Sequence, residues 1–198
     1  MDFTIESLST NIFTGATNAI YSKTESDNSH YKLLMGNAIS ELGEVTTDLL
    51  DNIEANDEKK LEKFLVNRGD VAILARGSSI RAGMITADIA ALKVIPSASF
   101  VIIRPDNKKL LGEVLVAYLN SSIGQSALAK LMRGVAVQSV SASDLKQMTI
   151  QLPTADKQNE IAELFYVSNE AYKNGITFIE QQRKTAIACM LDIMMGAK

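Results

Sequence analysis

The stretch Gly69-Asp70-Val71-Ala72-Ile73-Leu74-Ala75-Arg76-Gly77-Ser78 decides how the middle of this chain folds. Its Gly-Asp start follows Arg68 and predicts a tight turn, because glycine and aspartate are favoured turn residues. The apolar run at 71–75 is short and bounded by turn residues, which is typical of a buried strand. Gly77 and Ser78 predict a loop that follows Arg76. The stretch therefore indicates a turn, a core strand and an arginine-bearing loop.

The composition of the 198-residue chain is that of a soluble globular protein, with enough residues for one domain and an appendage. Apolar residues make up 46% of the chain, and no apolar run approaches the roughly 20 residues of a membrane span. The N-terminal MDFTIESLST lacks the basic and apolar regions of a secretory signal. The single cysteine, Cys189, excludes an internal disulfide and suits a reducing compartment. We expect a cytoplasmic protein with no membrane partner.

Charge is distributed unevenly, although the formal net charge is only −3. Residues 1–58 carry 2 basic and 11 acidic side chains, a net charge of −9. Residues 59–150 carry 13 basic and 6 acidic side chains (net +7), and residues 151–198 carry 5 and 6 (net −1). Because salt screens charges over about 8 Å, a polyanion responds to the local field of the basic segment. Ordinary variation of surface charge is the alternative explanation.

Apolar runs and turn residues predict further strands and helices. We expect strands at 91–95, 100–103 and 148–152, a loop at Gly83, and a surface loop from Tyr21 to Ser29. Apolar residues three and four apart predict a helix over 111–119. Ser121 or Ser122 is expected to cap a second helix. Residues 135–143 predict a small polar loop or a strand.

The C-terminal segment has no proline and one glycine, Gly175, between Thr154 and Met195. Thr154 is expected to cap a helix there. Apolar residues repeat along it at heptad-like spacing and predict a seam for another helix, formed by Ile161, Phe165, Tyr172, Ile179, Ala186 and Ile193. A single helix of this length would reach roughly 60 Å, so we expect part of it to contact a partner. Two shorter helices folded back at Gly175 are the alternative.

A series of motifs makes the chain resemble the DNA specificity subunits of type I restriction-modification systems. In chain order they are IFTGAT (12–17), GDVAILARGS (69–78), SFVIIRP (99–105), VLVAYLNS (114–121), IGQSALAKLMRG (123–134) and VSASDLKQMTIQLPTADKQNEIAEL (140–164). The last motif is the most specific, with a Leu-Pro strand end, Gln158 and an isoleucine-led amphipathic helix. Thr154-Ala155 and Lys157 depart from the usual family pattern.

This resemblance implies an α+β, or mixed α/β, target recognition domain followed by a long C-terminal coiled-coil-type α-helix. It implies a recognition domain at 1–150 and a helical spacer and dimerisation region at 151–198. Family members hold half of a split site in double-stranded DNA and dock the methyltransferase (modification) subunit, with the restriction subunit as a further partner. Two such units normally share one polypeptide, whereas this chain resembles one. It is therefore either a natural half-subunit, expected to form a homodimer through its C-terminal helix, or a fragment.

Candidate DNA contacts cluster in the basic segment. Base edges require donors and acceptors, while phosphates require cations or small polar donors. Arg76 and Arg133 are candidates for guanine or phosphate contacts, and Gln138 is the candidate for adenine. The whole expected DNA-facing set is Arg76, Ser78, Ser79, Arg81, Lys130, Arg133, Gln138, Ser139 and Ser141. The alternative for each is an exposed side chain without a partner.

Sequence motifs of catalysis are missing. The sequence has no Pro-Pro-aromatic motif of amino-methyltransferases, no P-loop and no GxGxxG. His30 is the only histidine, which excludes a multi-histidine metal site. We therefore expect a non-catalytic subunit with no cofactor and no metal. The competing hypothesis is a protein-interaction scaffold that acts through its C-terminal helix and does not bind DNA.

Overall fold

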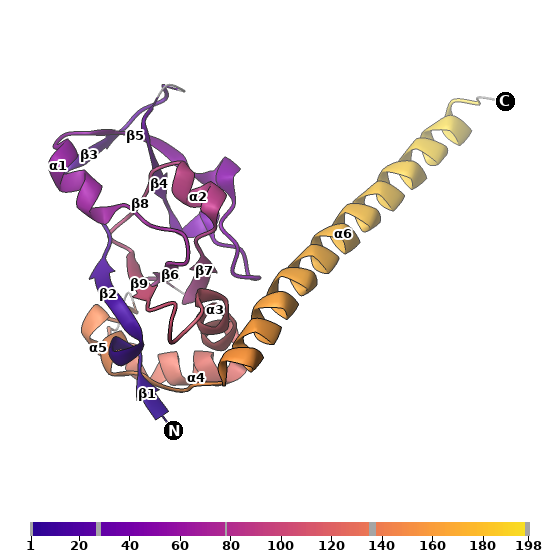
Figure 1. Ribbon diagram of the computed structural model, residues 1–198. Helices are drawn as coiled ribbons and strands as arrows, with labels where there is room; N and C mark the ends of the chain where they lie inside the picture. Colours follow the sequence, from indigo (N-terminus) through magenta and orange to yellow (C-terminus); the bar gives the residue numbers. More distant parts are fainter. Residues whose placement is uncertain (1, 27–28, 78, 135–137, 197–198) are drawn as a thin grey trace. The chain divides into compact units, whose positions relative to one another are not determined.

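The computed structural model describes residues 2–26, 29–77, 79–134 and 138–196 (Figure 1). The chain divides into two compact units, Met1–Ile161 and Ala162–Lys198. Unit 1 is a mixed α/β domain. Helix α6 (Ala155–Met194) begins in unit 1 and runs through most of unit 2. The expected fold class, an α/β domain followed by a long C-terminal helix, is confirmed.

The opening stretch contributes to a four-stranded antiparallel sheet in unit 1. Its strands, in spatial order, are β2 (Ser9–Thr14), β9 (Phe100–Pro105), β6 (Val71–Leu74) and β7 (Arg81–Met84). All four residues of β6 are buried, which confirms the predicted core strand. Gly69 has a φ of 90°, a conformation that glycine adopts without a steric penalty, so the predicted turn is also confirmed.

A second four-stranded sheet has the order β3 (Tyr21–Lys23), β5 (Asp51–Ala55), β4 (Tyr31–Leu34) and β8 (Val94–Pro96). Strand β4 pairs antiparallel with β5 and parallel with β8. One buried cluster joins the two sheets, because Leu34 and Val94 pack with Ala72, Phe100 and Ile102. Short helices accompany this region: η2 (Gly36–Ala38), η3 (Thr47–Leu49), α1 (Glu58–Leu61), η4 (Glu62–Phe64) and α2 (Ala87–Ala91).

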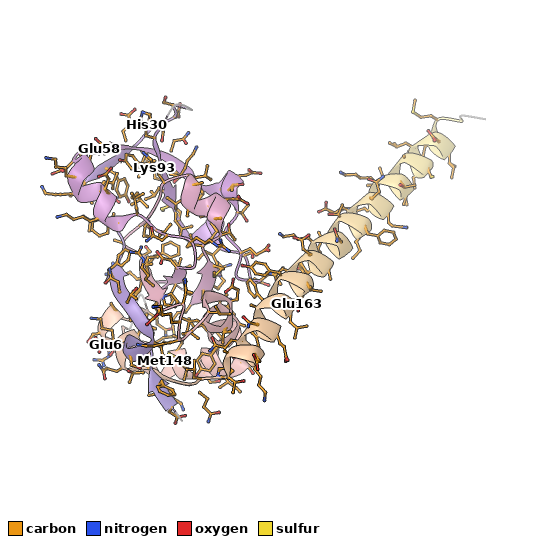
Figure 2. All side chains as sticks on the ribbon, viewed as in Figure 1. Glu6, His30, Glu58, Lys93, Met148 and Glu163 are labelled. Atoms are coloured by element: carbon orange, nitrogen blue, oxygen red, sulfur yellow. The ribbon has the colours of Figure 1, made fainter. Side chains whose placement is uncertain are left out.

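A two-stranded sheet pairs the beginning of the chain with the segment before α6. Strand β1 (Asp2–Thr4) runs antiparallel to β10 (Thr149–Gln151). The short helix η1 (Glu6–Leu8) follows β1, and the Ile5 amide donates to the Met148 carbonyl at 2.9 Å. Figure 2 shows Glu6 and Met148 at this end of unit 1. The strand predicted at 148–152 is thus confirmed in its central residues.

Three helices come after strand β9 in the chain, namely α3 (Gly112–Asn120), α4 (Ser122–Leu131) and α5 (Ala142–Gln147). Helix α3 confirms the helix expected at 111–119. The Ser121 hydroxyl accepts a hydrogen bond from the Gly124 amide at 3.1 Å, so Ser121 is the cap of α4. Helix α5 was not predicted and begins inside the segment expected to be a loop or strand; residues 135–137 of that segment lie outside the described residues.

Three local predictions are wrong in part. Gly83 lies within β7, and a side chain there would meet Ile39 at 2.9 Å, so this glycine permits close packing and does not mark a loop. Residues 91–95 are not one strand, because Thr86 caps helix α2 and Ala91 is its last residue. The loop expected from Tyr21 begins as strand β3, since the start of that segment pairs with β5.

Helix α6 is continuous over 40 residues, so the alternative of two helices folded back at Gly175 is wrong. The predicted cap residue Thr154 directly precedes it, and the Thr154 carbonyl accepts from the Gln158 amide at 2.9 Å. No helix in the described ranges is both long enough and apolar enough to cross a bilayer.

Gln158 ties the first turn of α6 to the rest of unit 1. Its side chain is only 5% exposed. Its Oε1 accepts from the Leu111 amide at 3.0 Å, and its Nε2 donates to the carbonyls of Lys109 at 2.9 Å and Pro153 at 3.2 Å. These bonds explain why the most specific motif of the sequence contains a glutamine, since a buried amide must satisfy both its donor and its acceptor.

Candidate nucleic-acid interface

Two segments far apart in the sequence are joined by backbone hydrogen bonds at the end of β6. The Gly77 amide donates to the Gln138 carbonyl at 3.2 Å, and the Val140 amide donates to the Ala75 carbonyl at 2.9 Å. Arg76 and Ser139 form an antiparallel bridge there. The arginine-bearing loop predicted from the opening stretch is therefore one half of a composite surface.

Within the second of these segments, Arg133 pairs with Ser139. The two residues exchange backbone hydrogen bonds of 3.0 and 2.9 Å. Ser139 thus pairs with both Arg76 and Arg133 through the backbone. We name the residues Arg76, Gly77, Arg133, Gln138 and Ser139 the bridge surface. Apart from Gly77, they are expected DNA contacts that the structure brings together.

The side chains of the bridge surface can meet a ligand. Arg76, Arg133 and Gln138 are exposed, whereas Ser139 is half-buried. The Arg133 Nη2 lies 3.0 Å from Asp144 Oδ1, and the Arg133 side chain remains 79% exposed. Surface ion pairs of this kind contribute little free energy. The pair therefore leaves most of the Arg133 side chain accessible to a ligand.

Ser141 has a structural role. Its hydroxyl accepts from the Asp144 amide at 3.0 Å and donates to Asp144 Oδ2 at 2.7 Å, which caps helix α5. The Ser141 hydrogen bond and the positive charge of Arg133 lower the pKa of Asp144. The Ser-x-x-Asp pattern at 141–144 is a helix-start signal that sequence reasoning could have used, and it would have found both α5 and Asp144.

The remaining expected contacts lie outside the bridge surface. Lys130 is exposed in the last turn of α4. Ser79 is exposed and Arg81 is half-buried as the first residue of β7. These two line a hollow of about 400 Å³. Ser78 lies outside the described residues.

The described residues contain no group of three or more histidine, cysteine, aspartate or glutamate side chains arranged to hold a metal ion. The predicted seam of α6 is a row of apolar side chains at helical spacing. Within it Ile161 and Phe165 are half-buried, while Tyr172, Ile179, Ala186 and Ile193 are exposed. Nearby Met190 and Met194 are also exposed, at 61% and 81%.

Solved structures of specificity subunits have a similar fold. An S subunit of a type I restriction-modification system from M. genitalium matches 93% of this chain with a TM-score of 0.58 and 18% identity. The HsdS subunit from Thermoanaerobacter tengcongensis matches 94% with a TM-score of 0.58 and 17% identity. A third structure, described as the structural basis of complex assembly and conformational transition of the type I R-M system, matches 100% with the same TM-score and 17% identity.

This chain spans 42%, 46% and 48% of the length of those three chains, which is less than half of each. No curated protein matches the chain. The family model described as type I restriction modification DNA specificity domain matches residues 7–187. Because that match includes most of unit 1 and most of α6, the chain belongs to the family of type I restriction-modification DNA specificity domains.

Proposed function

We propose that this chain binds one half of a split site in duplex DNA as a specificity subunit of a type I restriction-modification system. The observation that carries the proposal is the bridge surface. Backbone pairing holds two exposed arginines and an exposed glutamine on joined segments, and these side chains match guanine, phosphate and adenine. Family membership supports the same conclusion.

The charge distribution supports DNA binding through this part of the chain. All the residues of the bridge surface belong to the segment 59–150, which has a net charge of +7. The acidic residues are concentrated in 1–58. Because duplex DNA is a dense polyanion, the basic segment is favoured over the acidic segment as the part of the chain that contacts it.

The same proposal gives α6 two partners. Its exposed apolar row would be buried against α6 of a second copy, and the resulting homodimer would carry two recognition domains. The paired helices would dock the methyltransferase subunit, and the restriction subunit would join that complex. The chain itself would read the DNA and leave the chemistry to these cytoplasmic partners.

Binding of duplex DNA at a series of salt concentrations tests the proposal, with the full chain in complex with the methyltransferase subunit of its own system. Wild-type affinity should fall steeply as salt rises. If Arg76 or Arg133 contacts a phosphate, replacing it by alanine should lower the slope of log K against log salt by about 1. If it contacts a guanine, the preference for one base pair should weaken instead.

Lys59→Ala is the matched control, because Lys59 is an exposed cation on α1, outside the bridge surface. It should leave both the slope and the preference unchanged. An affinity of the wild-type complex that does not depend on salt would refute the proposal.

The exposed apolar residues of α6 also favour a second function, a protein-interaction scaffold that does not bind DNA. The double variant Arg76→Glu with Arg133→Glu separates the two functions. DNA-dependent methylation should be lost if the bridge surface binds DNA. It should be unaffected if the chain acts only through α6.

A further inference from the structure

The hollow of about 400 Å³ beside the start of β7 lies apart from the residues of the bridge surface. It is lined by side chains from the loop before β7, from β7 itself, from α3, from α4 and from the loop at 40–44: Glu41, Ser79, Ile80, Arg81, Asn120 and Gln125. Ser79 and Gly77 belong to the same β6–β7 loop. The lining of the hollow therefore begins only two residues after Gly77 of the bridge surface in the sequence.

Arg81 supplies unused donors to this hollow. Its Nε is buried and has no hydrogen-bond partner, and the described residues provide no partner for the rest of its guanidinium. Because the Nε itself is buried, a ligand in the hollow would engage the rest of the guanidinium.

The walls of the hollow are held in place by their own hydrogen bonds. Asn120 accepts from the Ala82 amide at 2.9 Å and donates to the Ala82 carbonyl at 2.8 Å, which joins the end of α3 to β7. Gln125 Nε2 donates to the carbonyls of Ile80 at 3.2 Å and Leu119 at 2.7 Å. These amides fix the backbone on both sides of Arg81, so the guanidinium extends from a rigid support.

Glu41 supplies an acceptor at the same hollow. Its loop is a tight turn, in which the Gly43 amide donates to the Ser40 carbonyl at 3.1 Å. The loop is fastened to β7, because the Gly43 carbonyl accepts from the Met84 amide at 2.9 Å. Gly43 has a φ of 75°, and a side chain there would meet Val116 at 2.5 Å. The exposed Glu41 thus lines the same hollow as Arg81.

We propose that this hollow reads the major-groove edge of one G·C base pair, with Arg81 donating to guanine and Glu41 accepting from the cytosine amino group. A G·C pair presents the O6 and N7 acceptors of guanine beside the N4 donor of cytosine. An A·T pair gives Glu41 the adenine N6 donor but gives Arg81 fewer acceptors. A carboxylate repels phosphate, which favours a base edge over the DNA backbone as the ligand.

This inference rests on the proposed function, since it requires duplex DNA to be the ligand. The test is selection of bound duplexes from a pool randomised over the half-site, using the full chain in complex with its methyltransferase subunit. Wild type should show a preference of about 10-fold or more for G·C at one position. Arg81→Ala and Glu41→Ala should each weaken the preference at that position and leave the others intact.

Glu41→Ala truncates a side chain at an exposed position, so it keeps the test valid even if Arg81→Ala weakens folding. Arg68→Ala is the matched control, because Arg68 is an exposed cation that does not line the hollow. Unchanged preferences in both variants would overturn the inference while leaving the proposed function standing. Equal loss of affinity for all sequences in Arg81→Ala would make Arg81 a phosphate contact and would also overturn it.

Discussion

Arg104 on β9 holds Asp70, the residue before β6, through two parallel hydrogen bonds. Arg104 Nε donates to Asp70 Oδ1 at 2.8 Å, and Nη2 donates to Oδ2 at 2.8 Å. Asp70 is only 1% exposed and also accepts from the Asn67 amide at 2.8 Å. The hydrogen bond to Asp70 raises the pKa of Arg104. One arginine of the basic segment is therefore committed to the turn that precedes the core strand.

Replacing Asp70 by asparagine should lower the free energy of unfolding by about 3 kcal/mol, because the half-buried Arg104 loses its counter-charge. Urea denaturation followed by circular dichroism would measure the change. Asp48→Asn, at an exposed aspartate, is the control and should change the free energy by less than about 0.5 kcal/mol. Equal stabilities of the two variants would contradict the assigned role of the pair.

Ser141→Ala should destabilise the protein by about 1 kcal/mol, because the Asp144 amide at the start of α5 loses its acceptor. Ser143→Ala is a matched control two residues further along the same helix, where the serine is exposed. It should be neutral or slightly stabilising, since alanine favours the helix. Thermal denaturation distinguishes the two variants, and an equal effect of both would rule out the cap.

Gln158→Leu should lower the free energy of unfolding by about 2 kcal/mol, because three backbone groups around the buried Gln158 side chain lose their hydrogen-bond partner. Hydrogen exchange of the Leu111 amide should become faster in the same variant. Gln181→Leu, at an exposed position of α6, makes the same chemical change without these bonds. Protection of Leu111 that stays at the wild-type level would show that Gln158 does not hold this amide.

Stability should fall as pH rises from about 10 to about 12. Burial, and then the hydrogen bond from its hydroxyl to Glu58 at 3.0 Å, raise the pKa of Tyr31 to about 12 (Figure 2 labels Glu58). A tyrosine in an unfolded chain ionises near pH 10. In this window the unfolded chain has released a proton that the folded chain keeps, so unfolding becomes more favourable, while below about pH 10 the contribution is fully present.

Denaturant unfolding at several alkaline pH values measures this dependence, and tyrosinate absorbance measures the pKa itself. Tyr31→Phe should flatten the loss of stability between pH 10 and 12. Tyr172→Phe, at an exposed tyrosine, should leave it unchanged. The same alkaline loss in Tyr31→Phe as in wild type would assign the effect to another group.

Ile179→Asp should weaken the proposed homodimer by about 10-fold or more, because an unpaired carboxylate in an apolar interface costs more than about 1.4 kcal/mol. Thr177→Asp introduces the same charge on the opposite face of α6 and should leave the dimer intact. Sedimentation equilibrium measures both dissociation constants. A wild-type chain that is monomeric at high concentration would contradict the dimer itself.

Local patterns in the sequence were sufficient for several elements. The apolar run after the Gly69 turn, the three-four spacing at 111–119 and the unbroken segment after Thr154 each predicted an element that the structure contains. These features depend on neighbouring residues: turn residues end a strand, apolar spacing selects a helix, and the absence of proline lets a helix continue. Family resemblance likewise required only the order of the motifs.

Tertiary structure alone decided how these pieces meet. The pairing of Arg104 with Asp70, the burial of Gly83 against Ile39 and the junction of Arg76 with Ser139 each join residues far apart in the sequence. Whether an arginine is half-buried against an aspartate, as Arg104 is, or exposed to a ligand, as Arg133 is, depends on which side chains the fold brings around it. Sequence reasoning therefore identified the arginine-bearing loop after the core strand, whereas only the fold supplied the second segment that makes it a surface.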